Sequence, residues 1–122
     1  MKTYVIAEVG PNHNGDINIA LEYIKVLSKI GCSAIKFQHG KPSRIFSNQS
    51  FFPKYQKKLS NNFDKPVLAA KKRLLKNSDQ VKLFNECKKY KVDYLCSAFD
   101  LQSIKFLNEN THLKYFKIPS GE

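Results

Sequence analysis

The feature that most constrains the fold is a regular alternation of β-type and helical segments. The β-type runs lie at 3–9, 34–38, 93–97 and 115–118, and amphipathic runs at 17–30, 79–90 and 101–108 separate them. The strand starts lie about 30 residues apart, the length of a βαβ unit, except across the long stretch 39–77. Strands joined by crossover helices form parallel sheets with right-handed connections. The alternation therefore predicts an α/β fold.

Four strands of this kind suit either half of a (β/α)₈ TIM barrel or a small open sheet. A complete barrel takes about 250 residues, and this chain has 122. The sequence stops directly after the fourth expected strand, with no helix to cover it, and a half barrel would leave sheet edges unpaired. We therefore expect residues 1–122 to be the N-terminal half of a barrel domain, truncated after its fourth strand.

Capping signals mark the helices. Asp16 is a good N-cap for the first helix, and Gly31 stands where a left-handed residue ends it. Ser78 is the expected cap of the helix over 79–90. The stretch 39–77 is the least regular part of the chain, with a short helix expected at 65–76.

The chain is strongly basic. Its net charge is +11, from 21 Lys and Arg against 10 Asp and Glu, and many of the lysines fall within 54–91. Such a field attracts nucleic acid or anionic metabolites, although a lysine-rich run is more often a solvated surface. No RNP, helix-turn-helix or zinc-finger pattern accompanies the charge, so we expect no nucleic acid partner. A non-catalytic basic module that binds nucleic acid or another polyanion is the alternative interpretation.

Other global features indicate the cellular setting. No apolar run approaches the roughly 20 residues of a membrane span, and the N-terminus carries no signal-peptide pattern, so we expect a cytoplasmic protein without membrane association. The three cysteines have no CxxC or CxxH spacing, which indicates buried, reduced thiols rather than a zinc site.

Polar residues cluster at the carboxyl ends of the expected strands, the edge where parallel α/β folds bind ligands. Lysines there suit a phosphate or a carboxylate, and glutamates suit sugar hydroxyls or proton transfer. No glycine-rich nucleotide motif is present. The candidate site residues are Glu8, Asn12, His13, Lys36, Gln38, Ser97, Lys117, Ser120 and Glu122.

Each candidate also has a purely structural interpretation. The lysines and glutamates can be surface residues, although a lysine facing inward from an apolar strand is costly unless it is used. Asn12 and His13 can simply shape the loop, and Asp100 is more typical of a helix N-cap than of a catalyst.

Four motifs together resemble the sialic acid synthase family, which includes synthases of N-acetylneuraminic, legionaminic and pseudaminic acids. They are Ile6-Ala-Glu-Val-Gly-Pro-Asn-His-Asn-Gly15, Ala34-Ile-Lys-Phe-Gln38, Cys96-Ser-Ala-Phe-Asp100 and Lys117-Ile-Pro-Ser-Gly-Glu122. The resemblance covers nearly the whole chain and is weakest over 39–77. Family members often carry Ser-Thr-Pro-Phe where this chain has Cys96-Ser-Ala-Phe, and a small hydroxyl residue where it has His39.

The resemblance implies a (β/α)₈ barrel that condenses phosphoenolpyruvate with an N-acylated amino sugar of the N-acetylmannosamine type and releases phosphate. It implies that Lys36, Ser97, Lys117 and Ser120 bind phosphoenolpyruvate and that Glu8 and Glu122 are catalytic, positioning the sugar and moving protons. Asn12, His13 and Gln38 would line the same mouth. A related phosphoenolpyruvate-dependent synthase acting on a different sugar is a further reading.

The resemblance also implies parts that this chain lacks. A divalent metal, Mn²⁺ or Mg²⁺, would activate the sugar aldehyde through ligands beyond residue 122, and no metal ligand is expected within this chain. A C-terminal antifreeze-like domain and a homodimer are expected of the full-length protein. The fragment alone is expected to lack turnover.

Overall fold

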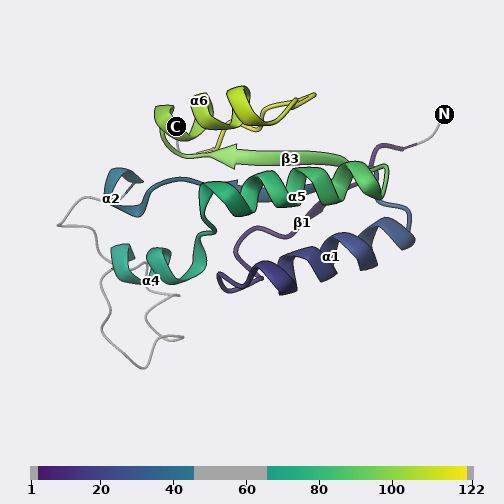
Figure 1. The fold of residues 1–122 in the computed structure, drawn as a ribbon, viewed down its shortest axis with the longest axis horizontal. Coiled ribbons are helices and arrows are strands. Elements are labelled where there is room, and N and C mark those ends of the chain that lie inside the picture. The colour runs from purple at the N-terminus through teal and green to yellow at the C-terminus, as the bar shows by residue number, and fades with distance from the viewer. Residues whose placement is uncertain (1–2, 46–65, 121–122) are drawn as a thin grey trace.

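A parallel sheet with the strand order β1-β2-β3 forms the centre of the computed structural model, which describes residues 3–45 and 66–120 (Figure 1). This confirms the expected α/β class. The elements are, in chain order, β1 (Ile6–Glu8), α1 (Ile17–Lys29), β2 (Ala34–His39), α2 (Pro42–Ile45), α4 (Pro66–Arg73), α5 (Asn77–Lys89), β3 (Asp93–Ala98) and α6 (Leu101–Asn110).

One face of the sheet holds the hydrophobic core. Because side chains alternate between the faces of a strand, Ile35, Phe37, Tyr94 and Cys96 share one side, and all four are buried. They form one cluster with buried residues of α1 and α5, the helices that run side by side along the strands (Figure 1). Burying a side chain such as Phe37 contributes about 2–3 kcal/mol.

The opposite face of the sheet carries polar side chains. Glu8 pairs with Lys36, Lys36 pairs with Leu95, and Gln38 pairs with Ser97. Along each strand these positions alternate with the core positions. Their side chains therefore lie on the face of the sheet away from α1 and α5. The strand register therefore places these polar side chains on the face of the sheet opposite to the hydrophobic core.

The caps of α1 agree with the sequence. The Asp16 carboxylate accepts hydrogen bonds from the backbone N–H groups of Asn18 and Ile19, at 2.7 and 3.4 Å. Gly31 has a φ of +91°, the left-handed conformation expected after the helix. The buried stripe contains Ala20 and Ile24.

The expected Ser78 cap is wrong. Helix α5 begins at Asn77, Lys76 is its N-cap residue, and no side chain caps it. The backbone turns earlier because the N–H groups of Asp79 and Gln80 both bond to the carbonyl of Lys76, at 3.0 and 3.1 Å. Ser78 therefore falls inside the helix and is exposed.

The fourth expected strand, 115–118, is also wrong as a strand. The structure has a single parallel bridge there, between Ser97 and Lys117. Tyr115, Phe116 and Ile118 are 49, 46 and 74% exposed. Strands of parallel sheets are normally covered on both faces, and the described residues leave the side chains of this segment largely exposed.

Strand β1 is shorter than the expected 3–9 and is not covered on both faces. It is an edge strand paired only to β2, and Ile6 is 47% exposed. Within 39–77, α4 confirms the short helix expected at 65–76, and α2 is a helical turn that the sequence did not predict. Residues 46–65 are outside the described part of the chain.

The cysteines behave as expected. All three are free thiols, with Cys87 and Cys96 buried. Burial raises the pKa of both thiols to about 12, so they stay protonated at neutral pH.

Asp100 joins the ends of two helices. Its carboxylate caps α6 through the N–H and hydroxyl of Ser103, at 3.0 and 2.8 Å. It also accepts the Lys41 N–H at 2.9 Å and pairs with Arg44 of α2 at 3.2 Å. Burial by itself raises the pKa of this carboxyl, but the hydrogen bonds from Lys41, Ser103 and Arg44 outweigh it and lower the pKa to about 2.

We expect Asp100 to make the fold sensitive to acid. Because its folded pKa of about 2 lies below the ordinary 3.8, its stabilisation is complete above pH 5 and is lost as the pH falls toward 2. The shift corresponds to about 2 kcal/mol. Replacing Asp100 with Asn should lower the unfolding free energy at pH 7 by about that amount and flatten its decline below pH 5, as measured by urea unfolding across pH. Parallel pH curves for the two proteins would contradict this role.

Candidate functional site

The candidate site centres on an ion pair between neighbouring strands. The Lys36 ammonium contacts the Glu8 carboxylate, and the two side chains are 17 and 46% exposed. The same ammonium lies 3.5 Å from the hydroxyl of Ser97 on β3. Glu8, Lys36 and Ser97 come from three strands and meet near the carboxyl edge of the sheet.

The strand register explains this convergence. Paired residues of a parallel sheet project to the same face, and residues two apart on a strand also share that face. Glu8 is level with Lys36, Gln38 is level with Ser97, and the bridge places Lys117 beside Ser97. These five residues, far apart in sequence, therefore share one face of the sheet.

Lys117 joins this group through its backbone. Its ammonium donates a hydrogen bond to the carbonyl of Ile118, and the residue is exposed. The structure thus places Lys117 beside Ser97 while its amine bonds to its own segment. A ligand at this edge would compete with a single carbonyl for that amine.

Gly10 brings two of the candidates close to the loop after β1. A Cβ atom on Gly10 would lie 3.0 Å from Glu8 Oε1 and 3.4 Å from Gln38 Nε2, and the φ of Gly10 is +50°. The absence of a side chain therefore lets Glu8 and Gln38 pack against the loop backbone.

The end of β2 has a support that sequence reasoning missed. The amide of Gln80 on α5 donates to the carbonyl of Gln38 at 3.1 Å and accepts from the Tyr94 hydroxyl at 2.5 Å. Gln80 is fully buried. Its position three residues before the buried Leu83 and seven before Cys87 was a sequence signal for an inward-facing polar residue.

Asn12 and His13 shape the loop. The Asn12 side chain donates to the carbonyl of Val9 at 2.8 Å, and the Nδ1 atom of His13 accepts the N–H of Gly15 at 3.0 Å. His13 is 2% exposed, and burial lowers the pKa of its imidazole, against the opposing effects of Asp16 and a hydrogen bond with Gly10. A neutral, buried imidazole in this loop stabilises its conformation.

The remaining candidates lie at the C-terminal end. Ser120 is exposed in a turn after Pro119. Glu122 lies outside the described residues, so its predicted role stays a prediction.

The arrangement is suited to binding an anion. An ammonium beside a hydroxyl offers two donors to one phosphate or carboxylate, and a neighbouring carboxylate can accept a hydroxyl proton. Within residues 3–45 and 66–120, no three His, Cys, Asp or Glu side chains are grouped so as to hold a metal ion. None of the helices in that part of the chain has the length and apolar character to cross a membrane.

We expect substitution of Gly10 by Ala to disturb this site. A left-handed Ala costs about 1–2 kcal/mol, and its methyl group would press on Glu8 and Gln38. The change should lower the unfolding free energy by that amount and shift the NMR signals of both side chains. Gly31→Ala is the matched control, since Gly31 also has positive φ but a Cβ there meets nothing within 4 Å. Equal spectra at the site in both variants would contradict the proposed contact.

Comparison with known proteins adds independent information. The sequence profile of the NeuB family matches residues 23–122. The N,N'-diacetyllegionaminic acid synthase of Campylobacter jejuni is 38% identical over 121 residues, 99% of this chain and 36% of that protein. The enzyme of the same name from Legionella pneumophila is 32% identical over 122 residues, 100% of this chain and 34% of that protein. The chain thus spans about a third of the length of these curated relatives.

A solved structure shows the same fold. The N-acetylneuraminic acid synthetase of Leptospira borgpetersenii superposes with a TM-score of 0.79 at 24% identity, over 97% of this chain and 36% of that one. The small parallel sheet and its helices thus correspond to about a third of that TIM-barrel protein, which confirms the expected fold class.

Proposed function

The chain belongs to the NeuB family of sialic acid and legionaminic acid synthases, and on that premise we propose that it forms the N-terminal part of a synthase barrel. The proposed reaction joins phosphoenolpyruvate to an N-acylated amino sugar of the N-acetylmannosamine type and releases inorganic phosphate. The activity belongs to the protein in which the rest of the barrel is present, because the chain covers about a third of its relatives.

The observation that carries this proposal is the Glu8–Lys36–Ser97 cluster on the polar face of the sheet. A lysine that is 83% buried among apolar strand residues costs solvation free energy unless its charge is compensated. Glu8 compensates it in the free protein. An incoming anion can share or replace that compensation, so the site is ready for a negatively charged substrate.

Phosphoenolpyruvate suits this edge because it carries a phosphate and a carboxylate. We propose that Lys36 and the Ser97 hydroxyl bind one of these groups, and that Lys117 and Ser120 complete the anion site. Preorganised cations lower the barrier where negative charge develops, since they need no reorientation during the reaction. The Ile118 carbonyl releases the Lys117 amine when the anion binds.

The carboxylates are proposed to act on the amino sugar. We propose that Glu8 accepts a hydrogen bond from a sugar hydroxyl or moves a proton, held in place by Lys36 and by the contact with Gly10. Glu122 is proposed for the same part of the site, and Gln38, Asn12 and His13 for lining its mouth. The neutral His13 contributes by fixing the loop.

The divalent metal implied by the family would polarise the sugar aldehyde. Because the described residues gather no set of three metal-binding side chains, no step assigned to this chain runs through the metal. The roles proposed for Lys36, Ser97 and Glu8 are binding and proton transfer at their own atoms.

We expect Lys36→Ala and Lys117→Ala, each made in the full-length protein, to lower phosphate release from phosphoenolpyruvate and an N-acetylmannosamine-type sugar by at least about 100-fold. The loss follows from removing a fixed positive charge beside the substrate anion. Release of phosphate, followed over time, is the measurement. Lys29→Ala is the control, since this exposed lysine ends α1 away from the cluster.

Full activity in both substrate-site variants would reject the assignment. A panel of amino sugars in the same assay separates an N-acylmannosamine-type acceptor from another sugar. Salt-dependent retention of DNA or RNA without any phosphate release would instead favour the basic binding module suggested by the +11 charge.

A further inference from the structure

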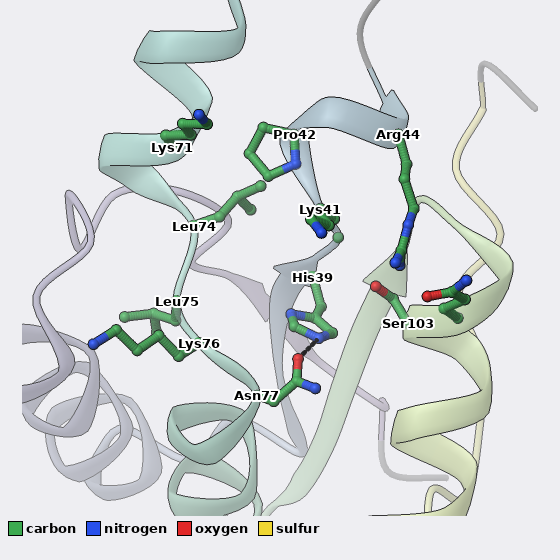
Figure 2. Close-up of a pocket in the computed structure, with 12 residues that line it drawn as sticks. His39, Lys41, Pro42, Arg44, Lys71, Leu74, Leu75, Lys76, Asn77 and Ser103 are labelled. Atoms are coloured by element: carbon green, nitrogen blue, oxygen red, sulfur yellow. Dashed lines mark hydrogen bonds between the residues drawn. The ribbon is translucent and has the colours of Figure 1, made fainter.

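A second cavity, of about 460 Å³, lies beside the end of β2 and is separate from the ion-pair cluster. Figure 2 shows it between the α2 segment, the link from α4 to α5, and the start of α6. His39, at the end of β2, forms part of its wall. Side chains alternate along β2, so the His39 side chain lies on the same face of the sheet as the core residues Ile35 and Phe37, opposite to Lys36.

The lining is positively charged. Lys41, Arg44, Lys71 and Lys76 contribute to it, and the described residues of the lining include no aspartate or glutamate. Arg44 pairs with Asp100 just beyond the lining. In Figure 2 the Lys71 and Lys41 side chains lie along the upper part of the cavity, whereas the Lys76 ammonium points away. Among the described residues, the structure gives neither Lys41 nor Lys71 a carboxylate partner.

A buried polar atom in the cavity wall also lacks a partner. His39 is 3% exposed, its Nε2 atom lies 3.0 Å from Asn77 Oδ1, and its Nδ1 atom has no hydrogen bond within the described part of the chain. Figure 2 shows this second nitrogen on the side of the ring toward Leu75 and Lys76. Leaving such an atom unpaired costs about 1–3 kcal/mol, which indicates a partner that residues 3–45 and 66–120 do not supply.

The start of a helix adds to the positive potential. Helix α5 has 13 residues, begins at Asn77 in the cavity wall and has no side-chain cap. Uncapped N–H groups and the helix dipole favour an anion at this end. The Nδ1 atom of His39 and the two lysines, all without partners among the described residues, are independent of the helix start. These three features meet in one cavity.

We propose that this cavity binds a small molecule through a phosphate group. A phosphate monoester carries a charge of about −1.5 to −2 at pH 7 and offers several acceptor oxygens. This matches a helix start and the ammonium groups of Lys41 and Lys71, which have no carboxylate partner in the described part of the chain. The His39 ring donates from Nδ1 when the Asn77 amide is turned to donate to Nε2. A cavity of about 460 Å³ holds a group the size of a sugar phosphate. Its concave form suits a compact ligand better than a nucleic acid backbone.

Isothermal titration calorimetry of the full-length protein with inorganic phosphate and with a hexose 6-phosphate tests the proposal. All proteins in this titration also carry Lys36→Ala, which suppresses binding at the ion-pair cluster. A failure of the proposed function is thereby distinguished from a failure of this proposal. We expect the double variant Lys41→Gln/Lys71→Gln to lose at least tenfold in affinity. The matched control Lys29→Gln/Lys88→Gln removes the same charge from two exposed helix ends and should keep the affinity of the Lys36→Ala protein.

NMR spectroscopy provides the second readout. Phosphate should shift the amide signals of Gly40, Asn77 and Ser103 and the His39 ring nitrogens, and should leave Glu8 and Ser97 unchanged. No binding, an equal loss in both double variants, or shifts confined to the ion-pair cluster would overturn the proposal. Single-stranded DNA that binds more tightly than either phosphate, with the same dependence on Lys41 and Lys71, would also overturn it in favour of a nucleic acid surface.

Discussion

The parallel register of three strands is the constraint on which the rest of the structure depends. It sets Glu8 level with Lys36 and Gln38 level with Ser97, while Ile35, Phe37, Tyr94 and Cys96 face the opposite way into the core. A slip of one residue in β2 would exchange the faces of its own side chains, turning Lys36 toward the core and Phe37 away from it. The hydrophobic effect that packs α1 and α5 on one face therefore also fixes the polar site on the other.

The positive charges of the lysines and arginine are compensated differently at the two sites. On the polar face, the partly buried Lys36 is balanced within the protein by Glu8. In the cavity beside β2, Arg44 is balanced by Asp100, whereas the ammonium groups of Lys41 and Lys71 border the same space as the orphan nitrogen of His39. A ligand at the first site must compete with Glu8 for Lys36. At the second site the two ammonium groups have no carboxylate partner among the described residues, so an incoming anion gains their full electrostatic attraction. This difference is the physical basis for treating them as separate sites.

Local signals in the sequence were reliable where one short-range interaction decides the outcome. Asp16 and Asp100 are N-caps because a carboxylate reaches N–H groups two or three residues ahead, and Gly31 ends a helix because it tolerates positive φ. The Ser78 cap failed because the backbone turn at Lys76 started α5 earlier. The expected strand at 115–118 forms only one bridge to β3, and its apolar side chains stay exposed, because strand formation depends on tertiary packing that no local pattern specifies.

The sequence by itself determined the α/β alternation, the Asp16 and Asp100 caps, the family and the residue types at the carboxyl ends of the strands, because periodicity, capping and motif spacing are properties of the chain alone. Only the tertiary structure decided that Glu8, Lys36 and Ser97 are in contact, that Gln80 supports the end of β2, and that one His39 nitrogen has no partner among the described residues. Those facts depend on which strands and helices become neighbours. That choice is made by burying apolar surface across the whole sheet, which no single segment specifies.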